Sequence, residues 1–182
     1  MKKRKQRGSL WPQLTPKKLL SLLGALVLGV FYTFFSPTGS ALYGTVTRVV
    51  DGDTIHVTIG GEDRTVRLIG VDTPETVHPQ KTPQFYGKEA SDFTKRSLLN
   101  QTVWLEYDAS PKDRYNRHLA YVWLAEPGAG EDTIRRDMFN ARLILDGYGK
   151  VMTIQPNSKY ADVFTRFQQE ARGAKKGLWG KR

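Results

Sequence analysis

The sequence contains no cysteine, so disulfide bonds, thiolate metal sites and cysteine nucleophiles are all excluded. Histidine is also scarce, with three residues in a chain of 182. We interpret His56 and His118 as structural residues of predicted strands, and His78 as a solvated residue of a polar loop. The search for a site therefore turns to carboxylates and arginines.

Beyond its first 18 residues the chain has little excess charge. Residues 1–18 carry seven of the 28 cations and no acid, so the remainder has 21 cations against 18 acids, a net charge of only +3. A net charge of +10 usually indicates nucleic acid or another acidic partner. Here most of that charge belongs to the N-terminal tail, so the total says little about the substrate.

An uncharged, mostly apolar run follows the basic tail at residues 19–36. Its length lies between the h-region of a signal peptide, roughly 7–15 residues, and a membrane helix of roughly 17–25. We favour an uncleaved transmembrane anchor over a signal peptide cleaved near the small residues 36–41, and over a buried core helix. The basic flank, residues 1–18, should stay cytoplasmic, which places the domain at 41–182 outside the cytoplasm.

The domain at 41–182 reads as α+β. Residues rich in β-branched side chains alternate with turn signals, which indicates short strands. We expect strands at 44–50, 54–59, 64–71, 102–107 and 118–124. We expect three helices, at 86–99, at 134–146 and through an apolar stripe of Tyr160, Phe164, Phe167, Ala171 and Ala174. A small closed barrel with helices outside would hide the edges of five strands.

A hairpin of the second and third strands would bring two acidic segments together. With a turn over residues 60–63, Asp53 pairs near residue 70, close to Asp72. Arg67 and Asp72 are five residues apart, so strict alternation puts them on opposite faces of the strand. They share a site only if the strand bends or bulges, and Gly70 is the easiest place for it.

These acids allow two interpretations. Two close carboxylates and a carbonyl oxygen would make a site for a hard cation such as Ca²⁺. Alternatively, Asp51 and Asp53 form a turn and Asp72 caps a segment. Arg67 and Arg117 either bind phosphate oxygens bidentately or pair with surface acids. A metal, two arginines and a spare carboxylate are the set that phosphodiester cleavage needs.

From about Tyr43 to Trp179 the sequence resembles the staphylococcal nuclease (thermonuclease) family. The motifs VVDGDT, RLIGVDTPET, YGKEASDFT, DRYNRHLAY and GLW occur in family order and at nearly family spacing. The resemblance implies a five-stranded OB-fold barrel with helices, preceded here by the hydrophobic segment. It also implies Ca²⁺-dependent hydrolysis of DNA and RNA, preferably single-stranded, to 3′-phosphorylated products.

Carried over by position, the resemblance assigns the metal to Asp53, Asp72 and the carbonyl of Thr73. It assigns catalysis to Arg67, Arg117 and Glu75, where Glu75 either removes a proton or positions water. It assigns contact with a second phosphate to Arg114 and Tyr115. These eight positions are the predicted site.

The sequence departs from the family in the longer loop 126–133 and in Thr153 and Gln155, where the staphylococcal enzyme has tyrosines near the base pocket. An aromatic stacking platform is worth roughly 1–3 kcal/mol per base, so base preference should differ. The alternative function is a catalytically inactive module of the same fold that binds nucleic acid or protein. A membrane-tethered structural protein would explain the tail but not the site. Nothing in the sequence points beyond a monomer.

Overall fold

The computed structural model describes residues 42–76 and 84–180. The predicted basic tail and apolar segment lie outside these residues, and so does His78. Within the described residues, no helix combines the length and the apolar character that crossing a bilayer requires.

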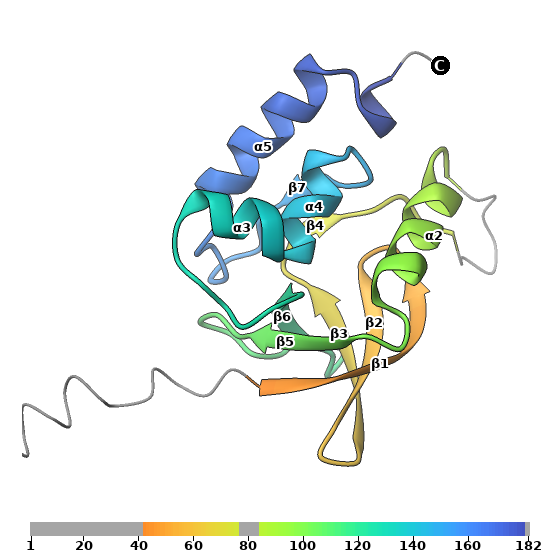
Figure 1. Cartoon of the computed structure of the whole chain (residues 1–182), viewed down its shortest axis with the longest axis vertical. Coiled ribbons are helices and arrows are strands. Elements are labelled where there is room, and N and C mark those ends of the chain that lie inside the picture. The colour runs from red at the N-terminus through yellow and green to blue at the C-terminus, as the bar shows by residue number, and fades with distance from the viewer. Residues whose placement is uncertain (1–41, 77–83, 181–182) are drawn as a thin grey trace, which may run out of the picture. The chain divides into compact units, whose positions relative to one another are not determined.

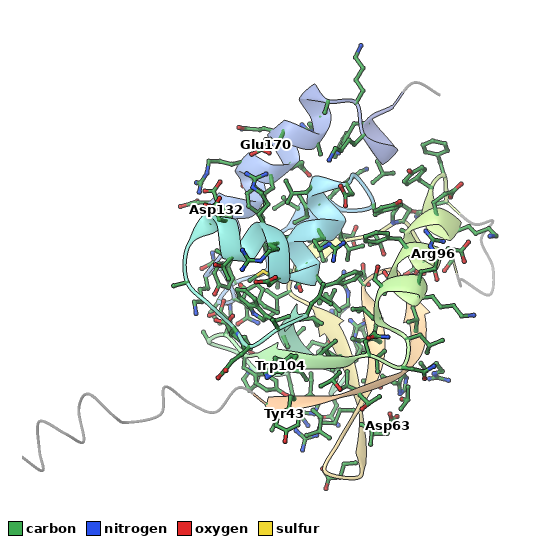
Figure 2. All side chains as sticks on the ribbon, viewed as in Figure 1. Tyr43, Asp63, Arg96, Trp104, Asp132 and Glu170 are labelled. Carbon is green, nitrogen blue, oxygen red and sulfur yellow. The ribbon has the colours of Figure 1, made fainter. Side chains whose placement is uncertain are left out.

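Five strands close into a barrel in the order β1, β2, β3, β6, β5, which confirms the predicted five-stranded fold (Figure 1). The strands are β1 (Leu42–Asp51), β2 (Thr54–Ile59), β3 (Glu62–Leu68), β5 (Thr102–Glu106) and β6 (His118–Trp123). Only β3 and β6 pair in parallel among these neighbours. In β1, residues 42–45 pair with β5 and residues 45–51 pair with β2, and two register shifts lie in the part that pairs with β2. Figure 2 shows Tyr43 of β1 beside Trp104 of β5.

The β2–β3 hairpin turns one residue earlier than the sequence suggested. Ile59 pairs directly with Glu62, and the two glycines between them have φ values of 58° and 87°. Positive φ at both central residues is what a two-residue type I′ turn requires. The predicted register was therefore wrong by two residues, and the Asp53 carbonyl accepts its hydrogen bond from Leu68 N. A shift of two preserves the face of every side chain.

The predicted strand 64–71 is divided at Gly70. β3 ends at Leu68, and β4 (Gly70–Asp72) leaves the barrel to pair with β7 (Lys150–Met152). Gly70 has a φ of 78°, and a Cβ atom added there would lie 2.6 Å from the Phe164 ring. Glycine is required for both reasons. The bend that was predicted near Gly70 is confirmed.

Helices cover one part of the barrel (Figure 1). They are α2 (Gly87–Leu98), α3 (Glu131–Asp137), α4 (Phe139–Leu145), α5 (Ala161–Gly173) and the 3₁₀ turn η1 (Gly177–Trp179). The single helix predicted at 134–146 was wrong, because Met138 is extended and forms a β-bridge with Trp123. Pairing with the barrel edge interrupts the helix there.

The predicted apolar stripe packs α5 onto the rest of the domain. Phe164, Phe167 and Ala171 are buried, and Tyr160 packs against the core from its edge. Ala174 was wrongly included, since it is exposed at the C-cap of the helix. Phe164 is the side chain that meets Gly70, so the packing of α5 also maintains the bend between β3 and β4.

Candidate active site

Asp53 ties the two acidic segments together. It lies in the β1–β2 turn, and its Oδ2 accepts hydrogen bonds from Thr73 N at 2.8 Å and from Thr73 Oγ1 at 3.0 Å. Its Oδ1 accepts a hydrogen bond from Thr54 Oγ1 at 3.1 Å. The structure thus brings the DGDT and DTPE segments to one end of the sheet, as the sequence predicted.

Arg67 links the two carboxylates that the resemblance assigns to a metal. Its Nη2 lies 3.1 Å from Asp53 Oδ2 and 3.2 Å from Asp72 Oδ1. Its Nη1 donates to the carbonyls of Leu68 and Val71, both at 2.7 Å. These carbonyls flank the bend at Gly70, so the bend brings Asp72 close to Arg67 and also holds the guanidinium in place. The Arg67 side chain is only 11% exposed.

Burial and neighbouring acids raise the pKa values of two carboxyls in this region, Asp72 and Asp51. Burial raises the pKa of the Asp72 carboxyl, the neighbouring Asp53 raises it further, and Arg67 opposes both effects. Burial likewise raises the pKa of Asp51, against hydrogen bonds from Gly52 N and Thr76 Oγ1. Close carboxylates with raised pKa values favour a cation, because a positive charge stabilises their ionised forms.

Asp51, which the sequence analysis left as a turn former, supports the segment beside the candidate site. Its buried carboxylate accepts hydrogen bonds from Gly52 N at 2.7 Å and Thr76 Oγ1 at 3.0 Å. Thr76 follows Glu75, so Asp51 connects the end of β1 to the segment that carries the predicted base. The D-x-D spacing of the motif was the available signal for it.

Arg117 is held by an acid that the sequence analysis did not single out. Its Nε lies 2.7 Å from Asp113 Oδ2, and its backbone N donates to Asp113 Oδ1 at 3.0 Å. Tyr115 N donates to the same Oδ1 at 2.9 Å. Burial would raise the pKa of Asp113, but the Arg117 side chain and these backbone groups outweigh it and lower that pKa. Asp113 therefore fixes both the turn and the guanidinium.

Arg67, Glu75 and Arg117 line one cleft of about 280 Å³. Glu75 is exposed, and its backbone is tied to Gln84, whose N donates to the Glu75 carbonyl at 3.0 Å. Asp113 and Ile154 also line the cleft. The three predicted catalytic side chains thus face a common space, although they come from β3, the segment after β4 and the turn before β6.

A second depression of about 530 Å³ adjoins this cleft, and Arg117 lines both. Arg114 Nη2 donates to the Tyr115 hydroxyl at 2.7 Å, and its guanidinium carbon lies 4.8 Å from the centre of the Tyr115 ring. The Tyr115 side chain is 64% exposed beside this depression. Ile154, Gln155 and Pro156 form part of its wall. The predicted phosphate-contacting pair therefore lies next to the cleft that Arg67, Glu75 and Arg117 line.

The oxygen donors fit a hard cation better than a transition metal. Among residues 42–76 and 84–180, no three or more His, Cys, Asp or Glu side chains are grouped as a metal site. The available side-chain ligands are the carboxylates of Asp53 and Asp72, which meet at Arg67. Hard cations accept carboxylate and carbonyl oxygens and complete their shell with water, so a third side chain is not required.

Comparisons with known proteins agree with this arrangement. A family model described as "Staphylococcal nuclease homologue" matches residues 65–181. The thermonuclease of Staphylococcus hyicus is 49% identical over 134 residues, which cover 74% of this chain and 73% of that protein. The thermonuclease of Staphylococcus intermedius is 48% identical over 134 residues, 74% of each chain. Endonuclease YncB of Bacillus subtilis is 37% identical over 139 residues, 75% of this chain and 61% of that protein. The chain belongs to the staphylococcal nuclease family.

Proposed function

We propose that this protein is a Ca²⁺-dependent endonuclease that hydrolyses DNA and RNA, preferably single-stranded, and leaves 3′-phosphates. The observation that carries the proposal is the cleft in which Arg67, Glu75 and Arg117 meet, beside the carboxylates of Asp53 and Asp72. The names of the relatives, thermonuclease and endonuclease, support the same activity class.

The two arginines bind the scissile phosphate from different sides of the cleft. Arg67 is anchored by two backbone carbonyls and Arg117 by Asp113, so both guanidiniums are held in place before substrate arrives. Fixed donors aimed at developing charge stabilise a transition state without reorganisation. As water adds to phosphorus, negative charge grows on the equatorial oxygens, and the arginines offset it through charge-assisted hydrogen bonds.

Glu75 acts on the attacking water. Its position on the cleft wall and its exposure allow it to accept a proton from water or to orient that water toward phosphorus. The new P–O bond forms as the bond from phosphorus to the 5′ oxygen breaks; the phosphate remains on the 3′ side, and the 5′ oxygen leaves as a hydroxyl after it takes up a proton.

Asp53, Asp72 and the Thr73 carbonyl are the residues that would hold Ca²⁺. When bound, the ion supplies Lewis-acid stabilisation of the phosphate oxygens. Asp53 is already fixed by the Thr73 backbone N, and Asp72 is half exposed at the site, so a ligand can reach it.

An inactive binding module of the same fold is the alternative. The fold alone would support it equally well, but a binding module has no need for Glu75 and two anchored arginines in one cleft. We further propose that the protein is a monomer whose domain acts outside the cytoplasm, tethered or released according to the fate of residues 19–36. N-terminal sequencing of the mature protein distinguishes an anchor from a cleaved signal.

The activity test uses the purified full-length chain with single-stranded DNA and RNA. We expect cleavage with Ca²⁺ and none with EDTA, and products that need a phosphatase before a polymerase can extend them. Arg117→Ala and Glu75→Ala should each lower kcat by at least ~10²-fold, as removal of a transition-state donor or a base does. Arg136→Ala, an exposed cation on α3, is the matched control. Inactivity of the wild-type protein with each of several divalent ions would refute the proposal.

A further inference from the structure

A third depression continues the substrate-binding surface beyond Arg117. It has a volume of about 550 Å³ and shares Lys112, Tyr115 and Arg117 with the second depression. We call it the outer cleft; it is lined by Glu62, Asp63, Arg64, Thr65, Lys112, Tyr115, Asn116, Arg117 and His118. None of the roles assigned above uses Arg64, Lys112 or His118.

The topology of the barrel brings two new cations to this cleft. Arg64 lies on β3, and His118 begins β6, which pairs in parallel with β3 through Val66. Lys112 forms an antiparallel bridge with His118. His118 thus lies between β3, which carries Arg64, and the segment that carries Lys112.

Both cations lie close enough to His118 to affect its pKa. Burial lowers the pKa of His118, and Lys112 and then Arg64 lower it further. Lys112 Nζ donates to the neutral side-chain oxygen of Asn116 at 2.9 Å and has no carboxylate partner in the described part of the chain. Among the described residues, no carboxylate neutralises the positive charge that Lys112 brings to the outer cleft.

The acids on the rim weaken this field only in part. Glu62 lies 3.2 Å from Arg64 and is 75% exposed, so solvent screens that pair. The Asp63 carboxylate instead lies 2.6 Å from His56 Nδ1, and Figure 2 shows Asp63 on the β2–β3 hairpin. Arg64 can consequently exchange one exposed carboxylate for a phosphate without leaving a buried charge unpaired.

We propose that the outer cleft binds a further phosphate of the nucleic-acid strand whose scissile phosphate lies between Arg67 and Arg117. Arg64 and Lys112 are the ligands of that phosphate, and Tyr115 separates it from the second depression. The inference rests on the proposed nuclease function and specifies its substrate as a polynucleotide that extends past the second depression, in preference to a fragment of a few nucleotides.

The experiment compares two oligothymidylates, of four and of sixteen nucleotides, with the full-length protein. The double variant Arg64→Ala/Lys112→Ala should raise KM for the longer substrate about tenfold, as expected for the loss of two charge contacts. It should leave kcat for both substrates and KM for the shorter substrate within about twofold of wild type. The dependence of log kcat/KM on log salt should become shallower by about 0.7 for each phosphate that the variant no longer neutralises.

Two matched variants sharpen the comparison. Lys88→Ala/Arg136→Ala removes two exposed, paired cations from α2 and α3 and should change neither KM. Glu62→Gln releases Arg64 from its carboxylate and should lower KM for the longer substrate only. Circular dichroism checks that every variant is folded. An equal rise in KM on both lengths, or no change on either, overturns the inference.

Binding in EDTA, measured by fluorescence anisotropy with the sixteen-nucleotide probe, separates the two proposals. The Arg64→Ala/Lys112→Ala variant should bind this probe about tenfold more weakly than wild type. If wild type cleaves neither length but the variant binds more weakly, the nuclease proposal fails and the outer cleft still binds nucleic acid. If wild type cleaves both and the variant binds and cleaves like it, only the outer cleft is refuted.

Discussion

Replacement of Gly70 by alanine tests whether the bend between β3 and β4 builds the site. Gly70 has a φ of 78°, and left-handed backbone costs a residue with a Cβ roughly 1–2 kcal/mol. The added Cβ would lie 2.6 Å from the Phe164 ring, and overpacking of this kind costs about 1–3 kcal/mol. We therefore expect Gly70→Ala to lower the free energy of unfolding by about 3 kcal/mol, measured by urea denaturation of the full-length protein.

Gly60→Ala is the matched control, because Gly60 also has a positive φ, of 58°, but nothing lies within 4 Å of its Cβ position. It should cost only the backbone strain, about 1 kcal/mol. The double variant Gly70→Ala/Phe164→Leu should cost less than the sum of its single changes, since the smaller side chain relieves the clash. Equal costs at Gly60 and Gly70, or additive costs with Phe164, would refute this account of the bend.

Gly70→Ala should also lower catalytic activity. The Leu68 and Val71 carbonyls that hold Arg67 flank Gly70, and Asp72 follows directly. Misplacement of a positioned group by about 1 Å can cost ~10²-fold in rate. At a temperature where both variants are folded, kcat/KM should fall at least tenfold in Gly70→Ala and stay within about twofold of wild type in Gly60→Ala.

Two further predictions concern charge. Asp113→Asn should lower kcat about tenfold by releasing Arg117, and it should destabilise the protein near pH 7. Because the pKa of Asp113 is lowered in the folded state, the difference in stability between variant and wild type should shrink as pH falls below the ordinary aspartate value of 3.8. A pH-independent difference in urea titrations would contradict the ion-pair explanation. Ca²⁺ at about 100 times its Kd should stabilise the wild type by about 2.7 kcal/mol, which is measured as a rise in Tm. Asp72→Asn should abolish this rise. An equal rise in Tm in that variant would show that the ion binds elsewhere.

Much of the fold was predictable from local pattern. Alternating β-branched residues located the barrel strands, and the stripe through Phe164 and Phe167 located α5. The hairpin register was wrong by two residues, because the turn signals did not show that the turn begins one residue earlier, with Ile59 opposite Glu62. This error leaves the predicted facing of the site side chains unchanged, since a shift of two keeps each side chain on its face.

Other features depend on partners far away in the sequence. The helix predicted at 134–146 breaks because Met138 bridges Trp123 of the barrel, and no local residue marks the break. The local sequence marks Asp113 as a turn residue, and only the folded turn shows that its carboxylate pairs with Arg117. The outer cleft likewise depends on the parallel pairing of β3 with β6, which brings Arg64 toward Lys112.

By itself the sequence supplied the residues of the candidate site: the acids, the arginines and a glycine where the strand had to turn. Only the tertiary structure decided that these groups face one another. Side chains five residues apart on a regular strand lie on opposite faces, and the left-handed φ of Gly70, against which Phe164 packs, is what brings Asp72 to within 3.2 Å of Arg67. The side chains are specified locally, but their meeting depends on a backbone bend that tertiary packing maintains.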